Sequence, residues 1–145
     1  MQNIDLDSVS LQIVNDAPDA ILFSDREGII RLWNRGAQEI FGYSANEALG
    51  QSLDLIIPEG LRKRHWEGYH QVMASGKTRY GTELLSVPVT HRDGHQLSCA
   101  FSIIMIRDEN DTLIGIASIM RDVTAAWQKQ QDLTKELSQL KSKQQ

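Results

Sequence analysis

Residues 41–50 read FGYSANEALG, and this stretch contains the end of one helix and the start of another. Gly42 follows an apolar helical segment and is the residue type that most often ends a helix. Asn34 is suited to cap the beginning of that segment. Ser44 and Glu47 then form an S-x-x-E capping box, in which each side chain satisfies a backbone N–H of a new helical turn. The stretch therefore predicts two short helices joined by a tight turn.

The residues before this stretch favour a β-hairpin. Two short apolar runs, residues 20–23 and 29–33, lie on either side of a turn that contains Gly28. This pattern is typical of two antiparallel strands. Residues 5–14 carry apolar side chains at loosely helical spacing, which predicts a short flanking helix before the hairpin.

The residues after the stretch predict one long helix and then more strands. The helix is expected at about residues 61–75, with Gly76 as its C-terminal stop. Three strands are expected after it, at residues 80–90, 96–106 and 113–120. Asp93-Gly94 is a strong signal for a tight turn between the first two. Two strands before the helices and three after them indicate an antiparallel sheet of about five strands in an α+β domain.

The composition fits a single domain. The chain has 145 residues, of which 41% are apolar and 23% are charged, and these values are close to globular averages. A net charge of -4 gives little reason to expect a nucleic-acid partner. A single cysteine, Cys99, excludes an internal disulfide. The chain shows neither a signal peptide nor an apolar run of about 20 residues, so we expect a cytoplasmic protein with no membrane partner.

A polar helix is predicted from residue 125 onward. Its leucines recur at the a/d spacing of a coiled coil over less than two heptads, at Leu133, Leu137 and Leu140. This stripe either packs back on its own domain or serves as a dimer seam or output helix, and we favour the second interpretation. Together with Leu11 and Val14, it predicts a parallel homodimer through the terminal helices. At the start of the helix, Thr124 is expected to cap the first turn and Asp122 to accept hydrogen bonds.

The order of these elements and three landmarks together resemble the PAS domain family. The landmarks are FGYS with Glu47 and Gly50, then Arg92-Asp93-Gly94 between strands, then Arg121-Asp122-Val123-Thr124 before the last helix. The resemblance covers about residues 17–124, with 1–16 as an N-terminal flanking helix and 125–145 as a C-terminal signalling or dimerisation helix. It implies a PAS fold, a five-stranded antiparallel sheet with a helical wall, and a role in sensory signal transduction. A downstream signalling domain or kinase is the partner that the resemblance implies.

The long helix carries the residue that we expect to bind a ligand. At about 100° per residue, His65 and Tyr69 share the face that carries the apolar residues, whereas Trp66 and His70 rotate away from it. The stretch Arg62-Lys63-Arg64-His65 is similar to the haem-binding PAS oxygen sensors of the FixL and Dos type, and residues 65–77 match the Dos spacing without a gap. That resemblance implies haem b as the cofactor, with His65 as the proximal iron ligand. We expect its Nε2 to bind iron while Nδ1–H donates to a backbone carbonyl.

The rest of this resemblance is partial. Arg79 matches a basic position that binds a haem propionate, but Gln71 replaces its earlier basic partner. The positions of a distal arginine and a distal methionine hold Leu85 and Glu83, so we expect sterics and polarity to set gas affinity. The apolar lining is expected to be Ile56, Ile57, Leu61, Val72, Leu85, Ile103 and Met105. The cofactor-binding residues are therefore predicted to be His65, Tyr69, Arg79, Leu85, Ile103 and Met105.

Other interpretations stay open. The same apolar residues suit an ordinary core, so the chain is alternatively a PAS dimerisation or interaction module that binds another small apolar ligand or none. A purely structural adaptor is a further alternative. The sequence holds no Gly-rich phosphate loop and no nucleophile–base pair, so any catalytic output is expected on another domain or partner.

Two other groups of residues are assigned to structure. Cys99 lies in a predicted strand and not on the long helix, which sets aside flavin photochemistry and favours a small buried hydrophobe. His91 and His95 flank a tight turn with Asp93 between them. Without a further cysteine or carboxylate cluster, these three residues are expected to be solvated hairpin residues and not metal ligands.

Overall fold

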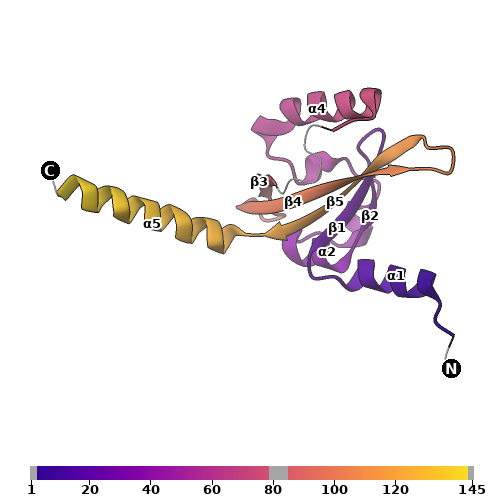
Figure 1. The fold of residues 1–145 in the computed structure, drawn as a ribbon, viewed down its shortest axis with the longest axis horizontal. Helices are drawn as coiled ribbons and strands as arrows, with labels where there is room; N and C mark the ends of the chain where they lie inside the picture. The colour runs from indigo at the N-terminus through magenta and orange to yellow at the C-terminus, as the bar shows by residue number, and fades with distance from the viewer. Residues whose placement is uncertain (1–2, 79–84, 144–145) are drawn as a thin grey trace.

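A five-stranded antiparallel sheet forms the centre of the molecule in the computed structural model, which describes residues 3–78 and 85–143 (Figure 1). The strands follow the spatial order β2-β1-β5-β4-β3. Their bounds are β1 (Ala20–Asp25), β2 (Ile30–Trp33), β3 (Leu85–Thr90), β4 (Gln96–Arg107) and β5 (Leu113–Asp122). The α+β architecture with a five-stranded antiparallel sheet is confirmed. The predicted start of β3 at residue 80 lies outside the described residues.

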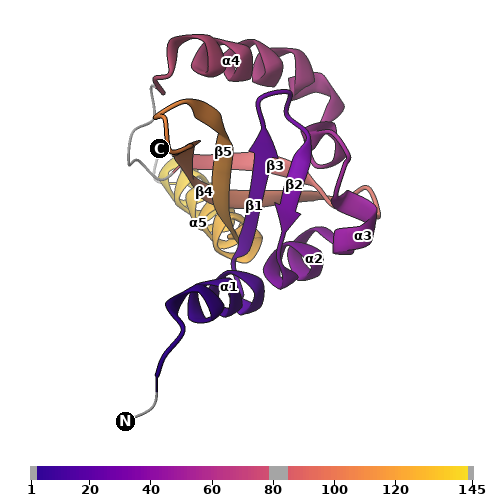
Figure 2. The same cartoon turned by 90° about the vertical axis from the view of Figure 1, so that its right-hand side faces the viewer.

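The helices lie around the sheet, except that α5 projects away from it (Figure 1). Their bounds are α1 (Leu6–Asp16), α2 (Arg35–Phe41), α3 (Ala45–Ala48), α4 (Arg62–Ser75) and α5 (Thr124–Lys143), with short 3-10 turns at η1 (Leu53–Leu55) and η2 (Glu59–Leu61). In both views α4 lies near the turn between β1 and β2, whereas α1 lies at the opposite end of these strands (Figures 1 and 2).

The predicted caps are present. The side chain of Asn34 accepts a hydrogen bond from Ala37 N at 2.9 Å, which caps α2, and also accepts one from Ile21 N at 2.8 Å. Gly42 ends α2 with φ at +87°, a conformation that glycine adopts without steric cost. Ser44 and Glu47 make both hydrogen bonds of the capping box at the start of α3. Local capping chemistry therefore fixes the turn that joins α2 to α3.

The hydrophobic core lies on one face of the sheet. Inward-facing residues of β1 and β2 pack against α2, where Phe41 is fully buried and its ring centroid lies 5.5 Å from that of Trp33. Burial of a side chain of this size stabilises the fold by about 1.5–3 kcal/mol. The hydrophobic residues with the least exposure are Ala20, Leu22, Ile30, Ala37, Phe41, Ala48 and Cys99.

The helices α1 and α5 contain no buried residues. Figure 1 shows α5 projecting away from the sheet, so the described part of this helix does not pack back on its own domain. Leu133, Leu137 and Leu140 are each more than half exposed. Among the described residues, no helix is both long enough and apolar enough to cross a lipid bilayer.

Candidate ligand site between the sheet and α4

Tyr69 defines the face of α4 that is turned toward the sheet. Its hydroxyl lies 2.9 Å from the Oγ of Ser24 on β1 and donates to the backbone carbonyl of Asp25. The residue is buried, and burial raises the pKa of its phenol. The predicted inward position of Tyr69 agrees with this placement. Its hydroxyl is occupied by protein partners, so Tyr69 anchors α4 to β1 through this group.

His65 lies one helical turn before Tyr69 and therefore on the same face of α4. Its ring centroid is 5.7 Å from that of Tyr69 and 4.7 Å from that of Trp66. The Nδ1 atom is buried and has no hydrogen-bond partner among the described residues. The expected hydrogen bond from Nδ1–H to a backbone carbonyl is therefore wrong for this structure. An unpaired buried polar atom is costly, unless a ligand satisfies it.

Burial lowers the pKa of His65, and the nearby His70 lowers it further, while the carboxylate of Asp54 partly opposes this shift. The imidazole is therefore neutral near pH 7. A metal ion binds the neutral ring, so the environment of His65 favours coordination over protonation.

Trp66 is not turned away from the domain, in contrast to the helical-wheel expectation. Its indole N–H donates to Asp54 Oδ1 at 2.7 Å, and its ring packs over Gly28 in the β1–β2 turn. A Cβ at Gly28 would lie 2.1 Å from the indole, so a larger residue has no room there. The helical-wheel prediction is wrong for Trp66 because a long side chain in a helix points toward the N-terminus and contacts surface beside the preceding turn. His70 is exposed, as expected.

Ile103 and Met105 of β4 pack against the same hydrophobic core as Tyr69 of α4. Leu85 pairs with Phe101 across β3 and β4, and period-two alternation puts Ile103 and Met105 on the same face of β4. All four side chains are only partly buried, although β4 is an internal strand of the sheet. The side chains around them therefore leave some of this apolar surface uncovered.

The remaining residues of the predicted lining differ in their placement. Ile56 is buried, and Ile57 and Val72 are half-buried and pack against the core. Leu61 is 39% exposed in the turn before α4, so it is not part of the buried core. The predicted residues Arg79 and Glu83 lie outside the described part of the chain.

Arg26 connects α4 to the sheet through hydrogen bonds, and no sequence pattern indicated this role. From the β1–β2 turn its guanidinium donates to the carbonyl of Leu113 on β5 at 2.6 Å and to the carbonyl of Met73 on α4 at 3.2 Å. The acceptors are backbone atoms, which carry no sequence signal. With Tyr69 and Trp66, this arginine sets the position of α4.

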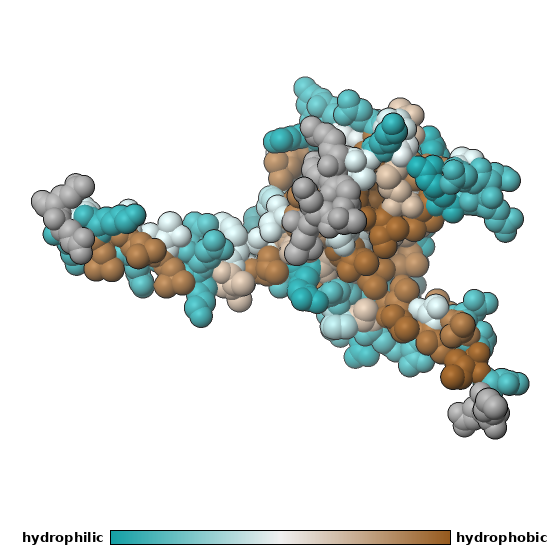
Figure 3. All heavy atoms as spheres, in the orientation of Figure 1, coloured by the Kyte–Doolittle hydropathy of each residue, from teal (hydrophilic) through white to brown (hydrophobic). Residues whose placement is uncertain are grey.

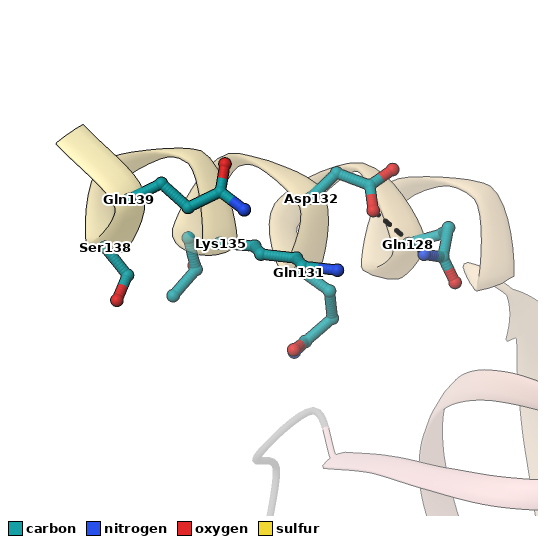
Figure 4. Close-up of a pocket in the computed structure, with 7 residues that line it drawn as sticks. Gln128, Gln131, Asp132, Lys135, Ser138 and Gln139 are labelled. Carbon is teal, nitrogen blue, oxygen red and sulfur yellow. Dashed lines mark hydrogen bonds between the residues drawn. The ribbon is translucent and has the colours of Figure 1, made fainter. Parts of the chain in front are cut away.

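Two other features do not suit an apolar cofactor. The open hollow along α5 is lined by polar side chains of that one helix, and Gln128 donates to Asp132 within it (Figure 4). Cys99 is fully buried on β4, and burial raises the pKa of its thiol to about 11. The thiol is thus protonated at neutral pH and serves as part of the core, as expected.

Comparison with known proteins gives a consistent assignment. Residues 11–123 match the family model described as the PAS fold. The structure superposes on the PAS domain of a Colwellia psychrerythraea protein with a TM-score of 0.73 and 25% sequence identity, covering 83% of this chain and 99% of that one.

Two sensor proteins, one of them an oxygen sensor, share local similarity with the chain. A segment of 53 residues is 42% identical to sensor protein FixL of Bradyrhizobium diazoefficiens, covering 37% of this chain and 10% of that protein. Oxygen sensor protein DosP of Escherichia coli is 23% identical over 105 residues, covering 72% of this chain and 13% of that protein. The chain thus spans about a tenth of the length of these relatives.

Proposed function

Because this chain belongs to the PAS family of sensory signalling domains, we propose that it binds haem b through His65 and senses a gas or a redox change. The observation that carries this proposal is the half-buried imidazole of His65 on the face of α4 that is turned toward the sheet, where no protein group among the described residues binds its Nδ1. The local similarity to FixL and DosP supports it. Domains of this family are typically non-catalytic, and the catalytic output then lies on another domain or partner.

The described residues fit a haem in two respects. The neutral imidazole of His65 supplies the ring nitrogen that an iron ligand requires. The partly uncovered side chains of Ile103, Met105 and Leu85 supply an apolar surface for a porphyrin. When bound, haem iron supplies a site for a diatomic gas and a one-electron redox couple.

Each residue of the proposed site has a distinct task. Tyr69 keeps the inward face of α4 fixed against β1, and this contact orients His65 one turn away. Leu85 would offer a bound haem neither an iron ligand nor a hydrogen bond. Gas affinity then depends on sterics and polarity.

We also propose that the active unit is a parallel homodimer formed by the terminal helices. The exposed leucines of α5 recur at coiled-coil spacing, and α1 exposes Leu6, Leu11 and Ile13. Figure 3 shows apolar surface along one side of α5 and over α1. A second copy supplies the same stripe in register, so each seam residue meets its own counterpart. A downstream signalling domain or kinase then receives the signal through α5.

A second candidate function is a PAS interaction module with another small apolar ligand or with none. The observation that favours it is that Phe101, Ile103 and Met105 already pack against the core. In this candidate the unpartnered Nδ1 of His65 binds a polar group of the other ligand, or water.

Hemin titration of the full chain distinguishes the two candidates. We expect the parent protein to bind one hemin and to develop an intense absorption band near the blue edge of the visible spectrum. The variant His65→Ala should lose this band, and the matched control His70→Ala, on the exposed side of the same helix, should keep it. A parent protein that stays colourless with excess hemin, or a band that depends on His70, would leave only the second candidate.

A further inference from the structure

The turn between β3 and β4 brings two histidines and one carboxylate together. His91 N donates to the carbonyl of His95 at 2.9 Å, and Gly94 N donates to the carbonyl of His91 at 2.9 Å, which closes the hairpin. The two imidazole rings are stacked, with centroids 4.5 Å apart and an angle of 22° between their planes. Asp93 lies between them in the sequence and folds back toward both rings.

The donor atoms of these three residues converge on one small region. One ligand atom from each of His91, Asp93 and His95 lies within 4.8 Å of the others. His91 Nδ1 is 3.2 Å from Asp93 Oδ1, and the same oxygen is in direct contact with His95 Nδ1. A tetrahedral ion with ligands at about 2.0–2.2 Å needs donors roughly 3.3 Å apart. Because imidazole lone pairs lie in the ring plane and the two rings are stacked, the exposed side chains of His95 and Asp93 must rotate before one ion contacts all three donors.

His91 is held in place from behind by the turn that ends α2. A Cβ on Gly42 would lie 2.7 Å from His91 Cε1 and 2.8 Å from Nε2, so the ring rests directly on the glycine backbone. On its other side, Nδ1 accepts a hydrogen bond from Asp93 N at 3.1 Å. An imidazole nitrogen has a single lone pair, so a metal ion bound at Nδ1 replaces this hydrogen bond.

The other two proposed metal ligands, Asp93 and His95, are accessible to an ion from solvent. The backbone N–H of His95 donates to Asp93 Oδ1 at 3.0 Å, which holds the carboxylate beside the two imidazole rings. The side chains of Asp93 and His95 are both more than half exposed, so an ion reaches them without opening the fold.

We propose that His91, Asp93 and His95 form a binding site for a divalent transition-metal ion, with Zn²⁺ as its representative, separate from the site at His65. Two imidazoles and one carboxylate suit zinc, nickel and copper better than magnesium or calcium, which prefer oxygen ligands. Water completes the coordination. The sequence pattern favoured solvated residues because it supplies only three ligands. The structure adds that one ligand atom from each of the three lies within 4.8 Å of the others.

An ion at this site stabilises an attachment that the hairpin already makes. Between the ligands, Arg92 N donates to the carbonyl of Phe41 at 2.9 Å, and its guanidinium contacts Glu47 Oε1 at 2.8 Å. Figure 2 shows the β3–β4 turn reaching the neighbourhood of α3. Because binding restrains the turn from which Arg92 projects, it also restrains the contact between the hairpin and the capping-box helix.

Calorimetric titration of the chelator-treated full chain with Zn²⁺ near neutral pH tests this site. We expect one ion per chain, and at least about tenfold weaker binding in His95→Ala and in Asp93→Ala. His70→Ala removes an exposed histidine elsewhere and should bind like the parent. In NMR spectra of the labelled protein, Zn²⁺ should shift the amide signals of residues 91–95 and of Gly42.

Three results would overturn the proposal. The first is no Zn²⁺ binding by the folded parent protein at millimolar concentration. The second is equal affinity in the parent, His95→Ala and Asp93→Ala. The third is a set of Zn²⁺-dependent NMR shifts confined to α4, which would assign binding to the other two histidines. The NMR readout uses the parent chain, so the test stands even where a variant fails to fold.

Discussion

The hydroxyl of Thr124, the first residue of α5, accepts a hydrogen bond from the backbone N–H of Ser98 on β4 at 2.9 Å. It also contacts the carboxylate of Asp122, which accepts from the Thr124 backbone N–H at 2.9 Å. Asp122 therefore satisfies a free N–H at the start of the helix, and Thr124 connects that helix to the sheet. The expected division of tasks, with Thr124 as the cap, is corrected in this respect.

Asp122→Ala should loosen the junction between the sheet and α5 while leaving the core folded. Loss of a helix-capping side chain costs about 1 kcal/mol. We expect faster hydrogen exchange in residues 125–140, and the control Glu136→Ala, a surface change within the same helix, should have little effect. Identical exchange rates in Asp122→Ala and the parent would show that this carboxylate does not stabilise the junction.

Leu133→Asp together with Leu137→Asp should convert the proposed dimer into a monomer. Both side chains are exposed on α5, so a charge is harmless in a monomer but unfavourable at a coiled-coil seam. Sedimentation at micromolar concentration measures the effect. Deletion of the residues from Ala126 onward should also weaken the dimer. The matched control is Gln131→Asp together with Lys135→Asp on the polar side of α5 shown in Figure 4. A monomeric parent chain would contradict the dimer proposal.

The ligand-free protein should lose stability as the pH falls below about 6.5, the ordinary pKa of histidine. The pKa of His65 is lowered in the folded state, so the unfolded chain takes up a proton over a pH range in which the folded ring stays neutral. Protonation of His65 therefore favours unfolding. This destabilising effect is absent well above the ordinary pKa of histidine. Denaturant titrations across pH should show a flatter decline for His65→Gln than for His70→Ala. Equal slopes in both variants would be inconsistent with the burial described.

Cys99 should resist aqueous thiol reagents in the native protein at about pH 8. Its side chain is fully buried and its thiol pKa is raised to about 11, so both access and the thiolate fraction are low. We expect slow labelling in buffer and complete labelling in denaturant. Fast native labelling would mean that β4 opens readily or that the thiol is more acidic than its surroundings imply.

The helix ends and the sheet were predictable because their causes are local. The Asn34 cap, the Gly42 stop and the Ser44–Glu47 capping box each depend on residues within one helical turn. Alternation along β4 likewise indicated the face that carries Ile103 and Met105. Helical periodicity alone placed His65 and Tyr69 on the same face of α4.

The contacts that build the site were less predictable because they join distant segments. Trp66 packs on Gly28, and Arg26 donates to carbonyls of two other elements, so neither contact leaves a pattern in either segment. The lack of a partner for His65 Nδ1 is a property of packing, and the sequence contains no sign of it. The convergence of His91 and His95 depends on hairpin register and on the support of Gly42.

The iron–histidine bond itself gives the most direct test of the haem proposal. The full chain is expressed with and without ¹⁵N-histidine, reconstituted with hemin and reduced to the ferrous state. Resonance Raman spectra then identify the iron–histidine bond by the isotope shift of its stretching band. We expect the band in the parent and in His70→Ala, its loss in His65→Ala, and its return when free imidazole is added to His65→Gly. A band that persists in His65→Ala, or its absence from the five-coordinate parent, would contradict the assignment of His65 as the ligand.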